Sequence, residues 1–157
     1  MPRRRIAPGR LRRWLRGDLD PAAMLGLHPE ARDDLAWQAH RRLQDGRVEE
    51  AERIYRLMEA LWPPGNSATR LGLAVCQQAR GDLAAAERGY DQVLAEEPGN
   101  AYALANRAEV RLLTDRPEAA RADLAEALAL LDRGGAPPDL RRRLERLREL
   151  VGGAGPW

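Results

Sequence analysis

The sequence has no phenylalanine, no lysine and a single cysteine, and each shortage narrows what the protein can be. The β-branched residues that strands favour are also scarce, with two Ile, five Val and two Thr against 27 Ala and 24 Leu. A sheet-based fold is therefore nearly excluded, and an all-α fold is expected. The lone thiol of Cys76 excludes an internal disulfide and a cysteine-based zinc site. No apolar run reaches the roughly 18 residues that a membrane span requires.

The absence of lysine leaves arginine to carry all 26 positive charges, and these are unevenly placed. Seven arginines and no acidic residue occur in residues 1–16, whereas residues 17–138 hold 14 Arg and 21 Asp plus Glu, a net charge of −7. The basic arm lacks the apolar stretch of a secretory signal. It is either a solvated arm or a segment that contacts the phosphates of nucleic acid or anionic lipid. We expect a cytoplasmic protein.

Three segments of the chain, residues 33–65, 67–99 and 101–134, repeat one pattern at offsets of 35 and 34 residues. This is the period of tetratricopeptide repeats, in which each unit is a helix-turn-helix pair. The corresponding positions are Gly46, Gly81 and Asp115 at the turn, Ala51, Ala86 and Ala120 where two helices approach, and Tyr55, Tyr90 and Leu124 one helical turn later. Pro63 and Pro98 end the second helix of their repeats, and Pro117 is expected just inside the second helix of the third.

Helices are also predicted on both sides of the repeats. In residues 1–32, Leu11, Trp14 and Leu15 share one face of a short helix, which either packs on the first repeat or forms a dimer contact. Asp20 is expected to cap a helix that has Pro21 at its first position, and His28 and Pro29 to open the next helix in the same way. In residues 135–157, a capping helix should bury Leu140, Leu144, Leu147 and Val151 before a flexible tail. Ser67 and Asn100 are further candidate N-caps.

No residue pattern points to catalysis. His28 and His40 are the two histidines, and their spacing does not place them on one metal ion. Cys76 is expected to be a buried, inert thiol. Because phosphate-binding loops, nucleophile elbows and metal motifs do not occur, we expect no enzyme, no cofactor and no metal site.

The second repeat, RLGLAVCQQARGDLAAAERGY from Arg70 to Tyr90, resembles the signature stretch of class II type III secretion chaperones. The third repeat is similar to the final repeat of that family, and so is the N-terminal order Trp14-Leu15-Arg16-Gly17 followed by Ala23-Met24-Leu25. The resemblance covers about residues 11–133. It implies a cytoplasmic bacterial chaperone that holds an extended N-terminal segment of a translocator protein, and it favours an N-terminal dimer contact through Leu11, Trp14 and Leu15.

Stacked helix pairs curve, so the first helix of each pair is predicted to line a concave groove. The helix period assigns thirteen positions to this groove: Ala36, Trp37, His40, Leu43, Leu71, Gly72, Val75, Gln78, Tyr102, Ala105, Asn106, Glu109 and Leu112. An apolar floor with a few amide and acidic groups suits an extended peptide. Gly72 either lets a client backbone approach closely or serves helix packing.

Two other functions remain open at this point. The chain could be a general tetratricopeptide scaffold that assembles protein complexes without holding a client unfolded. It could also be a nucleic-acid or lipid accessory that uses the arginine-rich arm, in which case binding should collapse at moderate salt.

Overall fold

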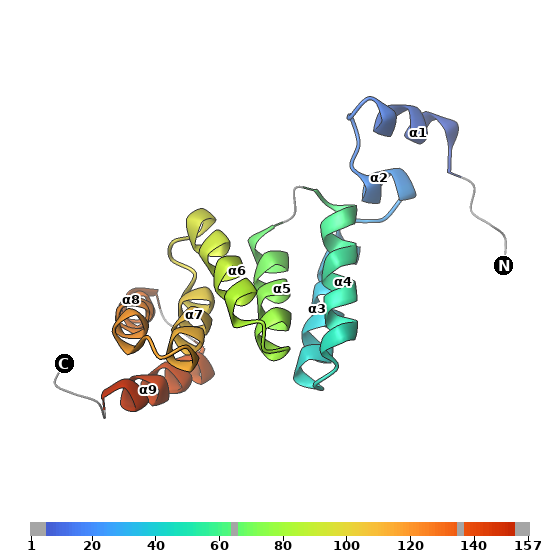
Figure 1. Ribbon diagram of the computed structural model, residues 1–157. Helices are drawn as coiled ribbons and strands as arrows, with labels where there is room; N and C mark the ends of the chain where they lie inside the picture. The colour runs from blue at the N-terminus through green and yellow to red at the C-terminus, as the bar shows by residue number, and fades with distance from the viewer. Residues whose placement is uncertain (1–5, 64–65, 135–136, 153–157) are drawn as a thin grey trace. The chain divides into compact units, whose positions relative to one another are not determined.

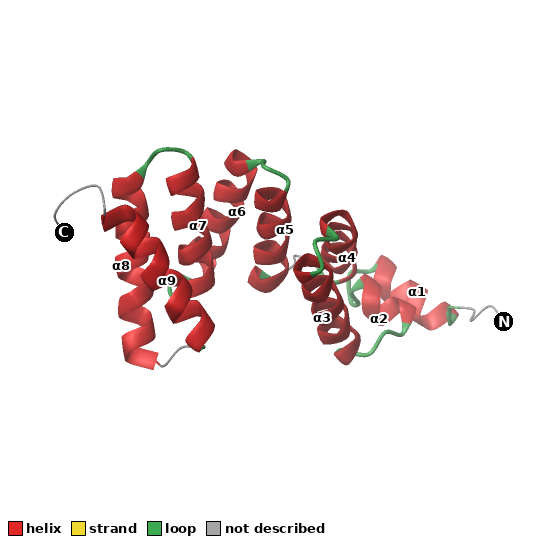
Figure 2. Ribbon diagram, turned by 90° about the horizontal axis from the view of Figure 1, so that it is seen from below, coloured by secondary structure: helices red, strands yellow, loops and turns green. Residues whose placement is uncertain are grey.

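The computed structural model describes residues 6–63, 66–134 and 137–152, which form α-helices joined by short connections and contain no strand (Figures 1 and 2). The all-α prediction is therefore confirmed. The helices are α1 (Pro8–Leu15), α2 (Pro21–Leu25), α3 (Glu30–Gln44), α4 (Val48–Leu61), α5 (Ser67–Ala79), α6 (Leu83–Glu96), α7 (Ala101–Leu113), α8 (Pro117–Gly134) and α9 (Pro138–Gly152). The chain divides into two compact units, Met1–Gly72 and Leu73–Trp157, whose boundary falls inside α5.

The first unit contains the first helix pair, α3 and α4, which pack against each other along their length. Its core is formed mainly by α4, which buries Ala51, Tyr55, Met58 and Leu61, and by Ala39 of α3. The preceding helices are attached through α2, which contacts α4, whereas α1 contacts α2 and buries no residue. The predicted close-approach alanine and the large residue after it are therefore both in this core.

The second unit is built on α7, which packs against α6 on one side and against α8 and α9 on the other. Figures 1 and 2 both show α7, α8 and α9 side by side. Ala86, Ala120, Tyr90 and Leu124, the repeat positions predicted to be buried, are fully buried here. Gly89 explains the close fit of α6 to α5, because a Cβ at this position would lie 2.7 Å from the Cβ of Ala74.

The turn inside each repeat has the backbone conformation that its sequence position predicts. Gly46 and Gly81 have φ values of 73° and 83°, and Asp115, which corresponds to them in the third repeat, has φ 57°. Glycine adopts this left-handed conformation without a steric penalty, and Asp is among the few other residues that tolerate it. The alignment of an aspartate with two glycines is thus confirmed by the backbone.

Two predicted helix caps are confirmed and two are wrong. The side chains of Asp20 and Asn100 accept hydrogen bonds from the backbone nitrogens three residues later, at 2.7 and 3.0 Å. For α5 the cap is Asn66 rather than Ser67, because Asn66 Oδ1 accepts from the Thr69 nitrogen at 2.7 Å. The predicted opening of α3 is also wrong, since Pro29 itself stands at the cap position and no side chain caps this helix.

The predicted capping helix is confirmed as α9. Its apolar residues Leu140, Leu144, Leu147 and Val151 are all buried, and they join the core that α7 and α8 form. The exposed end of a stack of helix pairs needs such a cover with a polar outer side. The predicted flexible tail at residues 153–157 and the first three arginines of the predicted arm, in residues 1–5, lie outside the described residues, whereas the rest of the arm forms α1 and its C-terminal cap, Arg16.

A buried carboxylate ties α7 to α8 in the second unit. The Asp123 side chain is 3% exposed and accepts hydrogen bonds from Arg107 Nε and Nη2 at 3.0 and 2.6 Å and from Arg111 Nη1 at 2.8 Å. Burial opposes the charge of Arg107, but the hydrogen bonds with Asp123 and Asp91 outweigh it and raise the pKa of the guanidinium. The two arginines thereby neutralise a charge that would be costly alone in the core.

Candidate peptide-binding surface

The groove positions predicted on α3 belong to the first unit and leave an aromatic residue open to solvent. Trp37 is 62% exposed, and the guanidinium carbon of Arg41 lies 5.4 Å from the centre of its ring. His40 is exposed, and its Nε2 lies 3.1 Å from Nε2 of Gln44. Ala36 and Leu43 are partly buried. This face therefore offers a flat aromatic ring and small apolar neighbours.

The start of α5, also in the first unit, contributes Leu71 and Gly72. Leu71 is partly buried, whereas Gly72 is buried against the ring of Tyr55 on α4. A Cβ on Gly72 would lie 2.3 Å from Tyr55 Cζ and 2.4 Å from Cε1. Of the two reasons that the sequence allows for this glycine, helix packing has a direct structural basis.

In the second unit, the predicted positions on α5 and α7 divide into exposed and buried members. Tyr102 is 47% exposed, and Val75, Gln78, Glu109 and Leu112 are partly buried. Ala105 is fully buried within the apolar core. Asn106 is 7% exposed. A ligand could therefore touch only some of the residues that the helix period assigns to the groove.

A line of hydrogen bonds joins polar side chains from four helices across this face. Tyr90 Oη donates to Gln78 Oε1 at 2.6 Å, and Gln78 Nε2 donates to Glu109 Oε2 at 3.2 Å. Arg143 of α9 donates to the same Glu109 oxygen and, through Nη1, to Asn106 Oδ1 at 2.8 Å. Burial is the main cause that raises the pKa of Tyr90, so its hydroxyl stays protonated and able to donate.

An open pocket of about 560 Å³ adjoins Tyr102 at the beginning of α7. It lies between the α6–α7 connection and the ends of α8 and α9 that face it. Its walls are Glu97, Gly99, Asn100, Ala101, Tyr102, Leu130, Leu131, Pro137 and Leu140. The apolar members make it suitable for an aliphatic or aromatic side chain of a bound polypeptide.

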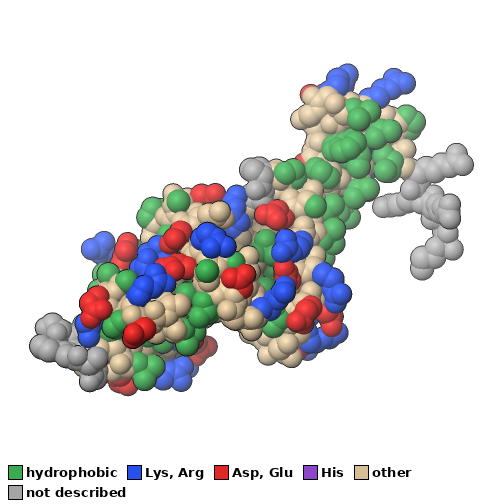
Figure 3. All heavy atoms as spheres, in the orientation of Figure 1, with side chains coloured by type: hydrophobic (Ala, Val, Ile, Leu, Met, Phe, Trp, Pro, Cys, Tyr) green, Lys and Arg blue, Asp and Glu red, His purple; other side chains and the backbone are tan. Residues whose placement is uncertain are grey.

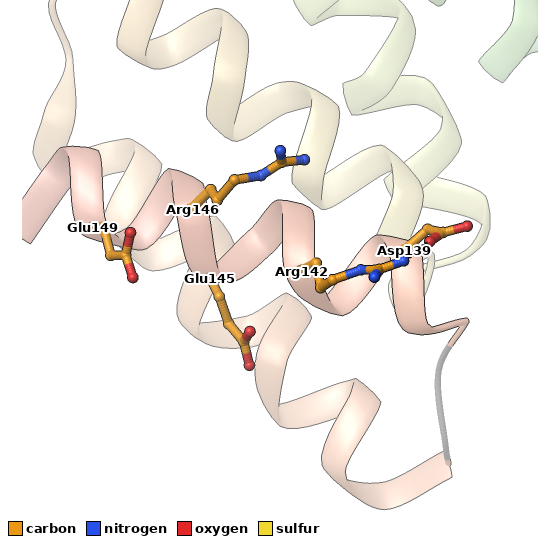
Figure 4. Close-up of a pocket in the computed structure, with 5 residues that line it drawn as sticks. All are labelled: Asp139, Arg142, Glu145, Arg146 and Glu149. Carbon is orange, nitrogen blue, oxygen red and sulfur yellow. Dashed lines mark hydrogen bonds and ion pairs between the residues drawn. The ribbon is translucent and has the colours of Figure 1, made fainter.

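A second depression, lined by Asp139, Arg142, Glu145, Arg146 and Glu149, runs along the outer side of α9 (Figure 4). All five side chains come from one helix, and the ion pair of Arg142 with Asp139 links two of them. Their spacing is that of neighbouring turns on a helix surface. We interpret this depression as the solvated face of the capping helix.

Sequence reasoning missed two features of the site, namely the contribution of Arg143 and the pocket beside Tyr102. Arg143 precedes the buried Leu144 and is not among the predicted groove residues. The pocket is lined by residues from three separate segments of the chain, which a helix-by-helix projection does not bring together. Tyr90 was placed in the core correctly, but its hydroxyl also orients a polar residue of the surface.

Cys76 is fully buried, as predicted. Within the described ranges, no three His, Cys, Asp or Glu side chains lie close enough to hold a metal ion. Among the same residues, no helix combines the length and the apolar character needed to cross a bilayer.

Comparison with known proteins first defines the class of fold. No family model matches the sequence. The chain is 37% identical over 109 residues to human tetratricopeptide repeat protein 34 and 42% identical over 72 residues to cellulose synthase operon protein C of Salmonella typhimurium. It spans 19% and 6% of the length of these relatives, and 68% and 46% of the chain is matched. The helices form three helix-turn-helix repeats of the tetratricopeptide type.

Within this class, the fold is shared with structures of type III secretion translocator chaperones. SycD of Yersinia enterocolitica superposes with a TM-score of 0.71 at 21% identity, covering 81% of this chain and 96% of SycD. PcrH of Pseudomonas aeruginosa superposes with a TM-score of 0.70 at 22% identity, covering 80% and 94%. The Sgt2 tetratricopeptide domain of Aspergillus fumigatus, with a TM-score of 0.65 at 16% identity over 81% and 82%, has the same fold. The fold expected from the resemblance is confirmed.

Proposed function

We propose that this protein is a class II type III secretion chaperone that binds an extended segment of a translocator protein and keeps it competent for secretion. One observation carries the proposal: the fold matches SycD and PcrH over 94% or more of their length. Solved structures of those proteins include PcrH with the chaperone-binding regions of PopB and PopD, and SycD with a YopD peptide. The protein would act in the bacterial cytoplasm by binding alone, without turnover.

Both units carry surfaces suited to a polypeptide client. In the first unit, the exposed Trp37 and its small neighbours would pack on apolar side chains. In the second unit, the pocket beside Tyr102 would accept one such side chain, and the polar groups of α7 would meet the client backbone. Shielding apolar client segments in this way would prevent their premature association.

The experiment is co-expression with a type III secretion translocator of the same organism, followed by pull-down. Leu112→Glu places a charge among the predicted contact residues and should abolish co-purification, as should Leu71→Glu and Val75→Glu. The adjacent Leu113, which is 62% exposed, provides the matched control, because Leu113→Glu adds the same charge outside the predicted groove. Circular dichroism checks that each variant keeps its helices.

Three results decide the proposal. Loss of the translocator with Leu112→Glu but not with Leu113→Glu would support it. Equal co-purification with both variants would contradict the groove assignment. No co-purification with the unmodified protein would contradict the chaperone function itself.

A general tetratricopeptide scaffold is the second candidate. The 37% identity to tetratricopeptide repeat protein 34 over 68% of this chain favours it. A scaffold would bind a folded partner, whereas a chaperone protects an unfolded segment. Limited proteolysis of the purified complex separates the two, since a scaffold's partner would resist cleavage by itself as well as in the complex.

We also propose that α1 and α2 form a homodimer contact. The predicted face of Leu11, Trp14 and Leu15 remains exposed, and so do Leu25 and Leu27 on and after α2. Figure 3 shows a patch of hydrophobic side chains on this part of the chain, with arginines at its edge. A second copy of the chain is the proposed occupant because such a patch is unusual on a monomer surface, and one structure of SycD is described as an alternative dimer.

A further inference from the structure

The hydrogen bonds on the α7 face fix the direction in which two polar side chains present their unused atoms. Arginine carries only donors, so Asn106 must turn its oxygen towards Arg143 and its Nδ2 amide group away from it. A carboxylate only accepts, so Gln78 must turn its amide group towards Glu109 and its oxygen towards Tyr90. Both orientations therefore follow from chemistry and not only from the placement of atoms.

This arrangement leaves one donor group and one acceptor unused. Asn106 Nδ2 has no hydrogen-bond partner in the described part of the chain, and Asn106 as a whole is 7% exposed. Both hydrogen bonds of the Glu109 carboxylate end on Oε2, so Oε1 stays open on a side chain that is 37% exposed. Asn106 and Glu109 are three residues apart on α7, which places them on the same side of the helix with their Cβ atoms about 5–6 Å apart.

We propose that Asn106 and Glu109 bind the main chain of the client, with Asn106 Nδ2 donating to a peptide C=O and Glu109 Oε1 accepting from a peptide N–H. This proposal rests on the proposed function and adds how the client is recognised. A residue in an extended chain presents its N–H and C=O to the same side, so one residue can make both bonds. Arg143, Gln78 and Tyr90 act as positioning residues because they hold the two side chains in place.

The charge balance favours a peptide group over a charged side chain. Arg143 pairs with Glu109, so the cluster has no net charge to offer a cation or an anion. The group that fits this cluster is therefore a neutral, dipolar one with one hydrogen-bond donor and one acceptor. Because every residue of a client has such a group, this contact would not depend on the client's sequence, and the apolar pocket beside Tyr102 would supply the selectivity.

The test uses a fluorescent synthetic peptide that covers the translocator segment left bound after limited proteolysis of the co-purified complex. Asn106→Asp keeps the oxygen that faces Arg143 but replaces the donor by an acceptor, so affinity should fall about tenfold. Glu109→Gln should weaken binding by a smaller factor, because one oxygen remains. Glu149→Gln, on the outer side of α9, and Gln92→Glu, at an exposed position of α6, are the matched controls and should bind normally.

A second measurement identifies the bond itself. A series of peptides is methylated at one backbone nitrogen at a time. At one position, N-methylation should lower the affinity for the unmodified protein about tenfold but should change the affinity for Glu109→Ala only slightly. If Asn106→Asp unfolds, Glu109→Gln and this cycle still decide the question. Normal binding by Asn106→Asp and Glu109→Gln, or fully additive N-methyl effects, would overturn the proposal while leaving the proposed function intact. Failure of the unmodified protein to bind any translocator segment would overturn both.

Discussion

Replacing Gly72 by alanine tests whether this glycine serves the packing of α5 on α4. The added Cβ would lie 2.3, 2.4 and 2.6 Å from Cζ, Cε1 and Cε2 of Tyr55, about 1 Å short of ordinary van der Waals contact. The Tyr55 side chain belongs to the buried core and has little room to retreat. Overpacking costs about 1–3 kcal/mol, and three contacts this short place the cost in the upper part of that range, about 2–3 kcal/mol, whereas the better helix propensity of alanine returns about 1 kcal/mol.

We therefore expect Gly72→Ala to lower the free energy of unfolding by about 1–2 kcal/mol, measured by urea denaturation with circular dichroism. The melting temperature should fall by roughly 2–8 °C. Gly134→Ala is the matched control, because no atom lies within 4 Å of the added Cβ at the end of α8. It should be neutral or slightly stabilising.

Shortening the opposing side chain identifies the cause. In a Tyr55→Leu background the ring is absent, so Gly72→Ala should stabilise the protein by up to about 1 kcal/mol through helix propensity, and the coupling energy of the pair should reach about 2–3 kcal/mol. Equal destabilisation in both backgrounds would refute the steric reasoning, as would an unchanged stability of Gly72→Ala. A variant with normal stability that loses its translocator segment would instead assign Gly72 to client contact.

Three further predictions concern charge and assembly. Asp123→Asn should destabilise the protein by about 3 kcal/mol in urea denaturation, because it leaves two arginines facing a neutral amide. The control Glu118→Gln, at an exposed ion pair, should change the free energy of unfolding by less than about 0.5 kcal/mol. Similar values for the two variants would count against a buried network. The hydrogen bond from Arg116 is the main cause that lowers the pKa of Glu87 below its usual 4.5. The ionised Glu87 therefore stabilises the fold fully above pH 4.5, and this contribution is lost as the pH falls through the pKa of Glu87 in the folded state. Melting curves should therefore place Glu87→Gln below the unmodified protein at neutral pH, with the gap closing in acid, and a constant gap would contradict this assignment. Deleting residues 1–28 should halve the mass found by sedimentation, and an unchanged mass would exclude the dimer contact through α1 and α2.

Much of the fold is predictable from local chemistry. The turn positions Gly46, Gly81 and Asp115 could be aligned because a reversal of the chain needs a residue that tolerates positive φ. Asp20 and Asn100 were recognisable as caps because a short acceptor side chain suits the first backbone nitrogens of a helix. Where two neighbouring residues could serve equally, as Asn66 and Ser67 could, local sequence did not discriminate, and the structure selects Asn66.

The candidate site was predictable only in part, since the helix period says which residues share a face and not how much of that face stays open. It selected Tyr102 and Ala105 alike, yet Tyr102 is half-exposed and Ala105 is fully buried. It did not include Arg143, because a residue 34 positions from Glu109 reaches it only when α9 has packed on α7.

The amino-acid sequence by itself determined the helical class, the three repeats, their turns and the apolar residues of the core, because these depend on periodicity and on backbone preferences within a few residues. Tertiary structure alone decided the role of Gly72 against Tyr55 and the orientation of Asn106 and Glu109. Both depend on distances between helices that are remote along the chain, and such distances are set only when the side chains pack.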